Sequence, residues 1–318
     1  MKMIRLASLC ATLLAAALQA ACVSQARSEL VEATSNEECV VLLHGLNRSW
    51  RAMRPMAEAL QEAGFTTVNI DYPSQSGTIE EIAPVAVSLG LDECRNAGAT
   101  RIHFVTHSLG GILLRYQNKF APIPDLGRVV MLGPPNQGSE IIDKTRDWPG
   151  FEMLSGAAGL QLGTDAESMP IALGPVNFEL GVIAGTGTIN VLASAMLPDP
   201  DDGKVSVAST QVDGMDDFLV VDNSHRYITR SDVVIRNTVS FLRSGAFITA
   251  DKAAIFQLDR CLQPSANIQQ QPFAVCVLAH RQHHQFMVDV VKIPLDIKIQ
   301  NPSIAPASLS GYSNGLYR

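Results

Sequence analysis

The stretch Ile102-His-Phe-Val-Thr-His-Ser108-Leu-Gly-Gly-Ile112 contains the pattern that decides the fold of this chain. An apolar, strand-like run precedes Ser108, and a helical spacing of apolar residues follows it. Gly110 leaves room for a sharp turn on one side of Ser108, whereas Thr106 stands on the other side where Gly is usual. A hydroxyl on such a turn projects above the strand end and receives the positive partial charge of the helix N-terminus. The pattern predicts that Ser108 is a nucleophile, and the alternative is an ordinary helix N-cap.

Strand and helix signals alternate on both sides of this turn. Strands separated by helices of this length form a mostly parallel central sheet with helices on both faces. The expected strands are Val40–Leu43, Phe65–Ile70, Arg101–Val105, Arg128–Leu132, Phe178–Ala184 and Phe218–Val221. The expected helices are Arg51–Ala63, Ile79–Cys94 with Pro84 inside it, Leu109–Phe120 and Ser231–Leu242.

His44-Gly45-Leu46 ends the first expected strand and predicts an oxyanion-binding loop. In this architecture a backbone N–H after that strand and the N–H after the nucleophile point toward developing negative charge. The predicted donors are therefore the backbone N–H groups of Leu46 and Leu109. His44 precedes the nucleophile in the sequence, so a structural histidine that bonds the loop is favoured over a general base.

A general base is expected on the loop after the last strand, where His225 lies in Asp222-Asn-Ser-His225. His103 lies inside a strand, and His107 is expected to point away from the reacting group. The histidines 280, 283 and 284 form a further cluster near the C-terminus, which is interpreted as solvated because no carboxylate partner has suitable spacing.

The supporting acid is expected between the nucleophile and the histidine in the sequence. Asp202 is the best candidate because its Asp-Gly pair stands directly before an apolar run. Asp201 and Asp199 are the alternatives, and an Asp-rich turn or calcium loop is the structural interpretation. A buried carboxylate here would fix the tautomer of the imidazole.

Together these segments resemble the α/β-hydrolase superfamily, and within it the bacterial triacylglycerol lipases and lipase-like esterases. The resemblance covers Cys39 to about Phe247 and implies an α/β-hydrolase fold, a catalytic triad of Ser108, Asp202 and His225, and a mobile lid in the insertion 139–176. Thr106 departs from the family pattern, and the tail after Phe247 matches nothing in it. The matching segments are His44-Gly45-Leu46, Thr106-His-Ser108-Leu-Gly-Gly111, Gly133-Pro-Pro-Asn-Gln-Gly-Ser139, Asp201-Asp202-Gly-Lys-Val205 and Ser224-His225.

The N-terminus resembles a targeting segment, because Lys2 and Arg5 precede an apolar run that is short for a bilayer span. We expect a signal peptide over residues 1–26, a catalytic domain over 27–247 and an extension of unknown role over 248–318. Cys22 after two alanines gives the alternative of a lipidated envelope protein; otherwise the protein is periplasmic or secreted. An exported chain favours disulfides, and the expected pairs are Cys39 with Cys94 and Cys261 with Cys276.

Composition limits the remaining function classes. The 318 residues are 47% hydrophobic and carry a formal net charge of −7, with no basic run that would favour nucleic acid. No cysteine has metal-site spacing, and we expect no cofactor. The predicted function is hydrolysis of a small-molecule or lipid ester, with membrane association possible through the lid or Cys22. The alternatives are transfer to another alcohol, amide or thioester cleavage, or a non-catalytic envelope binding protein with this fold.

Overall fold

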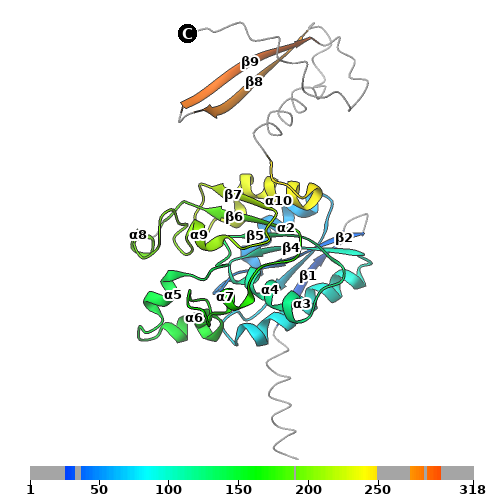
Figure 1. Ribbon diagram of the computed structural model, residues 1–318. Helices are drawn as coiled ribbons and strands as arrows, with labels where there is room; N and C mark the ends of the chain where they lie inside the picture. The colour runs from blue at the N-terminus through cyan, green and yellow to red at the C-terminus, as the bar shows by residue number, and fades with distance from the viewer. Residues whose placement is uncertain (1–25, 33–36, 190, 249–272, 283–284, 295–318) are drawn as a thin grey trace, which may run out of the picture. The chain divides into compact units, whose positions relative to one another are not determined.

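The structure is a computed structural model that describes residues 26–32, 37–189 and 191–248, together with two strands at 273–282 and 285–294. Its contacts divide the chain into two compact units, one ending at Ile248 and the other beginning at Thr249 (Figure 1). The first unit contains every expected site residue. Residues 1–25 of the expected leader, which include Cys22, and Cys261 lie outside the described residues.

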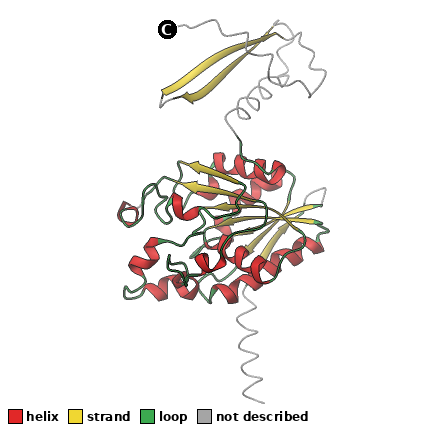
Figure 2. Cartoon of the chain, viewed as in Figure 1, coloured by secondary structure: helices red, strands yellow, loops and turns green. Residues whose placement is uncertain are grey.

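A seven-stranded sheet forms the centre of the first unit (Figure 2). The spatial order is β1-β3-β2-β4-β5-β6-β7, and all neighbours are parallel except β1, which pairs antiparallel with β3. Because the parallel strands run in one direction, their C-terminal ends share one edge of the sheet, where α/β folds place their sites. The strands are β1 (Arg27–Val31), β2 (Glu38–Leu43), β3 (Thr66–Asp71), β4 (Arg101–His107), β5 (Leu126–Leu132), β6 (Leu180–Gly185) and β7 (Asp217–Val221).

Helices cover both faces of this sheet, as the alternation in the sequence predicts. The long helices are α2 (Arg54–Glu62), α3 (Ile79–Asn96), α4 (Leu109–Phe120) and α10 (Asp232–Ser244). Shorter helices are η1 (Trp50–Ala52), α5 (Glu140–Thr145), α6 (Phe151–Leu160), α7 (Met169–Leu173), α8 (Val191–Ser194), α9 (Val207–Thr210) and η2 (Ile228–Arg230).

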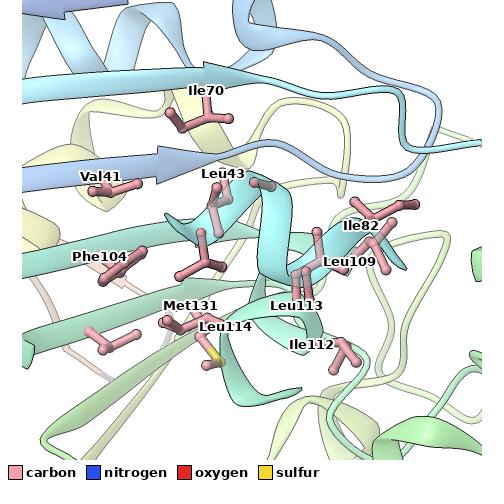
Figure 3. Packing of buried hydrophobic residues seen from close by; sticks show 14 of the residues in the cluster. Val41, Leu43, Ile70, Ile82, Phe104, Leu109, Ile112, Leu113, Leu114 and Met131 are labelled. Atoms are coloured by element: carbon pink, nitrogen blue, oxygen red, sulfur yellow. The ribbon is translucent and has the colours of Figure 1, made fainter. Parts of the chain in front are cut away.

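Alternate residues of the strands pack on opposite faces of the sheet. Val41 and Leu43 of β2 lie in the cluster that α3 and α4 cover, and Figure 3 shows them together with Leu109 and Leu113 of α4. Val40 and Leu42 lie in the other cluster, which contains buried residues of α2 and α10. Strands buried on both faces explain why their sequence is continuously apolar rather than alternating.

Two local features differ from the sequence expectation. β1 was not predicted, because its pattern is half exposed and it pairs only at the sheet edge. The helix expected over Arg51–Ala63 is divided at Met53 into η1 and α2, with Pro at the start of α2. Pro84 lies inside α3, as in the expected helix, and is exposed.

A disulfide joins Cys39 and Cys94, with a Cα–Cα distance of 5.7 Å, as the sequence predicts. It connects the start of β2 to the last turns of α3. No helix among the described residues has the length and apolar character needed to cross a bilayer.

The second unit contains an antiparallel pair, β8 (Phe273–Gln282) with β9 (Gln285–Pro294). The side chain of Cys276 and that of His280 are not described, and residues 283 and 284 lie outside the described residues.

Candidate active site

Ser108 lies on a strained turn between β4 and α4. Its backbone has φ 53° and ψ −123°, a conformation that L-residues rarely adopt, and α4 begins at the next residue. The Ser108 N–H donates to the carbonyl of Leu132 at 3.0 Å, which holds the turn against the end of β5. A strained serine at a strand–helix junction is the backbone geometry of an exposed nucleophile.

Two glycines allow the backbone to close around this turn. A methyl group on Gly45 would lie 2.9 Å from Ser108 Cβ and 3.0 Å from His107 Nδ1. A methyl group on Gly110 would lie 2.7 Å from the carbonyl oxygen of Leu43. The loop after β2 therefore touches the nucleophile turn because neither glycine has a side chain.

Thr106, the departure from the family pattern, fits because Gly111 stands opposite it. Thr106 is fully buried, and a methyl group on Gly111 would lie 3.2 Å from Thr106 Oγ1 and 3.1 Å from Met131 Sδ. The Thr106 side chain on β4 therefore occupies the space that a side chain at Gly111 of α4 would otherwise fill.

Asp202 and His225 form the expected acid–histidine pair. Asp202 Oδ2 accepts a hydrogen bond of 2.7 Å from His225 Nδ1, and the Asp202 side chain is fully buried. Asp202 Oδ1 accepts from the N–H groups of Lys204 and Val205, at 3.0 and 2.9 Å. The His225 N–H donates to the Asp202 carbonyl at 2.9 Å. The carboxylate thus fixes the imidazole with a proton on Nδ1 and a free lone pair on Nε2.

The two alternative carboxylates lie elsewhere. Asp201 is buried, and its oxygens accept from Ser194 Oγ at 2.6 Å and from the Gly203 N–H at 2.7 Å. Asp199 is exposed. Asp201 therefore attaches α8 to the acid loop, and neither residue contacts the imidazole.

His107 has a contact that the sequence did not predict. Its Nε2 donates to the backbone carbonyl of His225 at 3.0 Å, and the two imidazole rings lie 4.7 Å apart. The prediction that His107 points away from the reacting group overlooked that a buried neighbour of the nucleophile can support the base loop. Burial, followed by the nearby His225, lowers the pKa of His107 well below its usual value, which keeps the ring neutral.

This contact places the base loop beside Ser108. Within the described residues Ser108 Oγ makes no hydrogen bond, and the residue directly before it contacts His225. A methyl group on Gly133, next to the Leu132 carbonyl that accepts from Ser108, would lie 3.1 Å from His225 Nδ1 and 3.0 Å from Asp202 Oδ2. The turn of Ser108 and the loops that carry Asp202 and His225 therefore lie close together at the C-terminal edge of the sheet.

The expected oxyanion donors lie on the two segments that meet there. Leu109 is the first residue of α4, so its N–H has no acceptor within the helix. Neither that N–H nor the N–H of Leu46 donates to an acceptor among the described residues. Both groups are therefore free to bind a developing negative charge.

His44 is a structural residue of the oxyanion loop. It is fully buried and stacks on Tyr72 with ring centroids 4.0 Å apart. Nδ1 donates to the Gly45 carbonyl at 2.9 Å, and Nε2 accepts from the Tyr72 N–H at 3.3 Å. Burial lowers the pKa of His44, so the neutral ring uses both nitrogens to shape the loop.

Arg115 is a second residue that the sequence analysis did not single out. A positively charged residue among the apolar residues of α4 could have indicated it. It is buried, and burial lowers its pKa to about 10. Its guanidinium donates to Asn136 in the loop after β5 and to the carbonyls of Pro170 and Gly174 around α7. It thereby joins the helix behind the nucleophile to the insertion 139–176.

Two short helices beside the site expose large apolar side chains. α6 lies against the oxyanion loop, since Asn47 Nδ2 donates to the Leu154 carbonyl at 2.7 Å. α8 packs on α5 through a small apolar cluster and is held by Asp201. The exposed side chains are Trp148, Met153, Leu154, Ile189, Val191 and Leu192, each more than half exposed.

Among the described residues there is no group of three or more His, Cys, Asp or Glu side chains that could hold a metal ion. The chemistry that these residues support is nucleophilic attack by a serine with acid–base help from a histidine. A mostly parallel sheet with a serine on a strand–helix turn defines the α/β hydrolase class. The chain belongs to this family, since residues 40–280 match the model of the alpha/beta hydrolase family.

Solved structures agree with this fold. The mature lipase BlEst2 from Bacillus licheniformis is 17% identical with a TM-score of 0.56, covering 70% of this chain and 98% of that chain. Phospholipase PlaB from Legionella pneumophila, solved with thio-NAD, is 14% identical with a TM-score of 0.50. The match covers 80% of this chain and 67% of that chain. At such identities the likeness concerns the fold. No curated protein matches the chain in sequence. The family match extends beyond Phe247, where the resemblance in the sequence ended.

Proposed function

We propose that the protein is a serine esterase that cleaves carboxylic esters through an acyl-enzyme on Ser108. The observation that carries this proposal is the 2.7 Å hydrogen bond between the buried Asp202 and the half-buried His225, beside the strained turn of Ser108. Metal-free acyl transfer needs an activated hydroxyl, an oriented imidazole and donors for an oxyanion. The residues that the family pattern predicted supply all three.

In the proposed reaction His225 Nε2 takes the proton from Ser108 as the serine oxygen attacks the ester carbonyl. The Leu46 and Leu109 N–H groups stabilise the oxyanion, and loss of one such donor costs about 3 kcal/mol of barrier. The C–O bond to the alcohol then breaks, and His225 returns the proton to the leaving oxygen. A water molecule repeats the sequence on the acyl-enzyme, which releases the acid and restores Ser108.

The substrate class that fits is a lipid or other acyl ester. Exposed apolar side chains on α6 and α8 suit an acyl chain or a membrane surface, and those on α6 support the proposal that 139–176 is a mobile lid. We further propose that residues 27–247 form the catalytic domain and that the protein is exported. The Cys39–Cys94 disulfide is consistent with an oxidising compartment.

Labelling with a fluorophosphonate probe and turnover of p-nitrophenyl esters test the assignment. Ser108→Ala is expected to abolish both, whereas Ser244→Ala, an identical change at the exposed end of α10, is expected to leave both intact. Unlabelled wild-type protein would instead support a non-catalytic binding protein. Transfer of the acyl group to an added alcohol in preference to water would support the transferase alternative.

Activity profiled over acyl chain length, with and without an oil–water interface, tests the substrate class and the lid. A preference for long chains that rises at the interface supports a lipase. Equal activity on short soluble esters with no response to an interface contradicts the lid proposal.

A further inference from the structure

Three arginines lie on or near the loop that carries His225, and none of them has an acidic partner among the described residues. Arg226 directly follows His225, Arg230 ends η2, and Arg48 lies two residues after Leu46 on the oxyanion loop. All three are exposed, and none forms an ion pair with a described carboxylate. Some exposed arginines elsewhere are paired, such as Arg54 with Glu58 and Arg95 with Asp125, whereas Arg51, Arg236 and Arg243 are exposed and unpaired but are not grouped around the site.

Contacts within the site bring these three cations together. The guanidinium carbons of Arg226 and Arg230 lie 5.9 and 5.4 Å from the centre of the Tyr227 ring. Thr229 Oγ1 donates to the Ala52 carbonyl at 2.9 Å, which holds η2 beside the segment that follows Arg48. Partial burial, and then repulsion by Arg226 and Arg230, lowers the pKa of Arg48. Like charges thus accumulate next to the catalytic histidine.

Acidic residues outnumber basic ones in this chain, whose net charge is −7, yet no described carboxylate pairs with these three arginines. Like charges that lie close together repel one another, and binding of an anion relieves that repulsion. Arginine is also the side chain whose planar, multiple donors best match phosphate and carboxylate groups.

We infer that Arg48, Arg226 and Arg230 form an anion subsite for a phosphate or carboxylate group carried on the alcohol part of the ester. This inference rests on the proposed esterase function, because His225 must hand its proton to the leaving alcohol. The alcohol part therefore lies on the His225 side, where Arg226 is the next residue. The preferred substrate would be an acyl ester of an anionic alcohol, such as a glycerol phosphate.

The test compares two soluble short-chain esters that differ by one phosphate group, monobutyryl glycerol and monobutyryl glycerol phosphate, both below the concentration at which they form micelles. The triple variant Arg48→Gln, Arg226→Gln, Arg230→Gln is expected to lower the ratio of kcat/KM for the anionic over the neutral ester by about tenfold or more. The control Arg101→Gln removes the same charge at the opposite edge of the sheet, where β4 begins, and is expected to keep the ratio. An unchanged ratio in the triple variant, with both esters still cleaved, overturns the subsite and leaves the esterase proposal standing.

A binding measurement keeps the two proposals separable if neither ester is cleaved. Glycerol 3-phosphate, inorganic phosphate and glycerol are titrated into wild-type and triple-variant protein at low salt, followed by NMR. Binding of glycerol 3-phosphate that the triple variant loses supports the subsite, and equal binding to both proteins refutes it. If inorganic phosphate binds as tightly as glycerol 3-phosphate, the cluster takes free phosphate, and the assignment to the alcohol part is overturned.

Vesicles separate a membrane surface from a substrate subsite. Wild-type and variant proteins are sedimented with phosphatidylcholine vesicles, with and without phosphatidylglycerol. Loss of binding to anionic vesicles in the variant, together with an unchanged ester ratio, would assign the arginines to a membrane surface and overturn the subsite.

Discussion

Replacing Asp202 by Asn removes one charge without removing the hydrogen bonds that hold its loop. Oδ1 of Asp202 accepts from two backbone N–H groups, those of Lys204 and Val205, and only an oxygen can do so. The new amide NH₂ is therefore forced to occupy the position of Oδ2, 2.7 Å from His225 Nδ1. Two donors then face each other unless the imidazole moves its proton to Nε2, where it can no longer accept one from Ser108.

This wrong tautomer is expected to lower kcat for p-nitrophenyl ester hydrolysis by about ten-thousandfold. Asp201→Asn is the matched control on the adjacent residue. Its amide can keep the bond to the Gly203 N–H through oxygen and can donate to Ser194 Oγ, so little activity should be lost. For both variants the steady-state rate reports the loss of activity, and thermal melting reports whether the protein is still folded. An Asp202→Asn enzyme within about tenfold of wild type, or a larger loss in Asp201→Asn, would refute the reasoning.

Four further outcomes are expected. His107→Phe leaves the His225 carbonyl without its donor, so kcat should fall by about tenfold, and His107→Gln, which keeps an amide donor, should recover part of it. Gly45→Ala would place a methyl group 2.9 Å from Ser108 Cβ, so the rate of fluorophosphonate labelling should fall well below that of wild type. Cys39→Ala with Cys94→Ala opens a link with a sequence separation of 55, so urea titration should show a loss of about 4 kcal/mol in the free energy of unfolding. Burial lowers the pKa of both His44 and His107, and unfolded imidazoles titrate near pH 6.5, so unfolding takes up protons below about that pH. The free energy of unfolding should therefore fall as the pH decreases below about 6.5, and His107→Phe should flatten this dependence.

Much of the fold could be predicted because the sheet is buried on both faces. A strand such as β2 must then be apolar throughout, and the helices that cover it must show helical spacing, so both signals are strong in a single sequence. The pairing of Asp202 with His225 could be expected because the family order places an acid between the serine and the histidine, and the structure shows their hydrogen bond. β1 escaped prediction because an edge strand that is exposed along one side has little apolar pattern.

The side-chain contacts could not be predicted from one sequence. His107 and His225 are 118 residues apart, and their contact depends on how β4 and the last loop meet. Arg115, from its sequence alone, could have been a solvated helix residue, and its buried role depends on Asn136 and on α7. Choosing between Asp201 and Asp202 likewise requires knowing which oxygen faces the ring.

The loop that carries Asp202 is also hydrogen-bonded to α8, since the preceding residue, Asp201, accepts a hydrogen bond from Ser194 Oγ. Consecutive Cα atoms are separated by a rigid peptide unit, so a displacement of Asp201 also displaces Asp202. Movement of α8 must therefore either break the bond between Ser194 and Asp201 or shift the backbone of Asp202. This one hydrogen bond couples the position of α8 to the orientation of the His225 ring, which the Asp202 carboxylate holds.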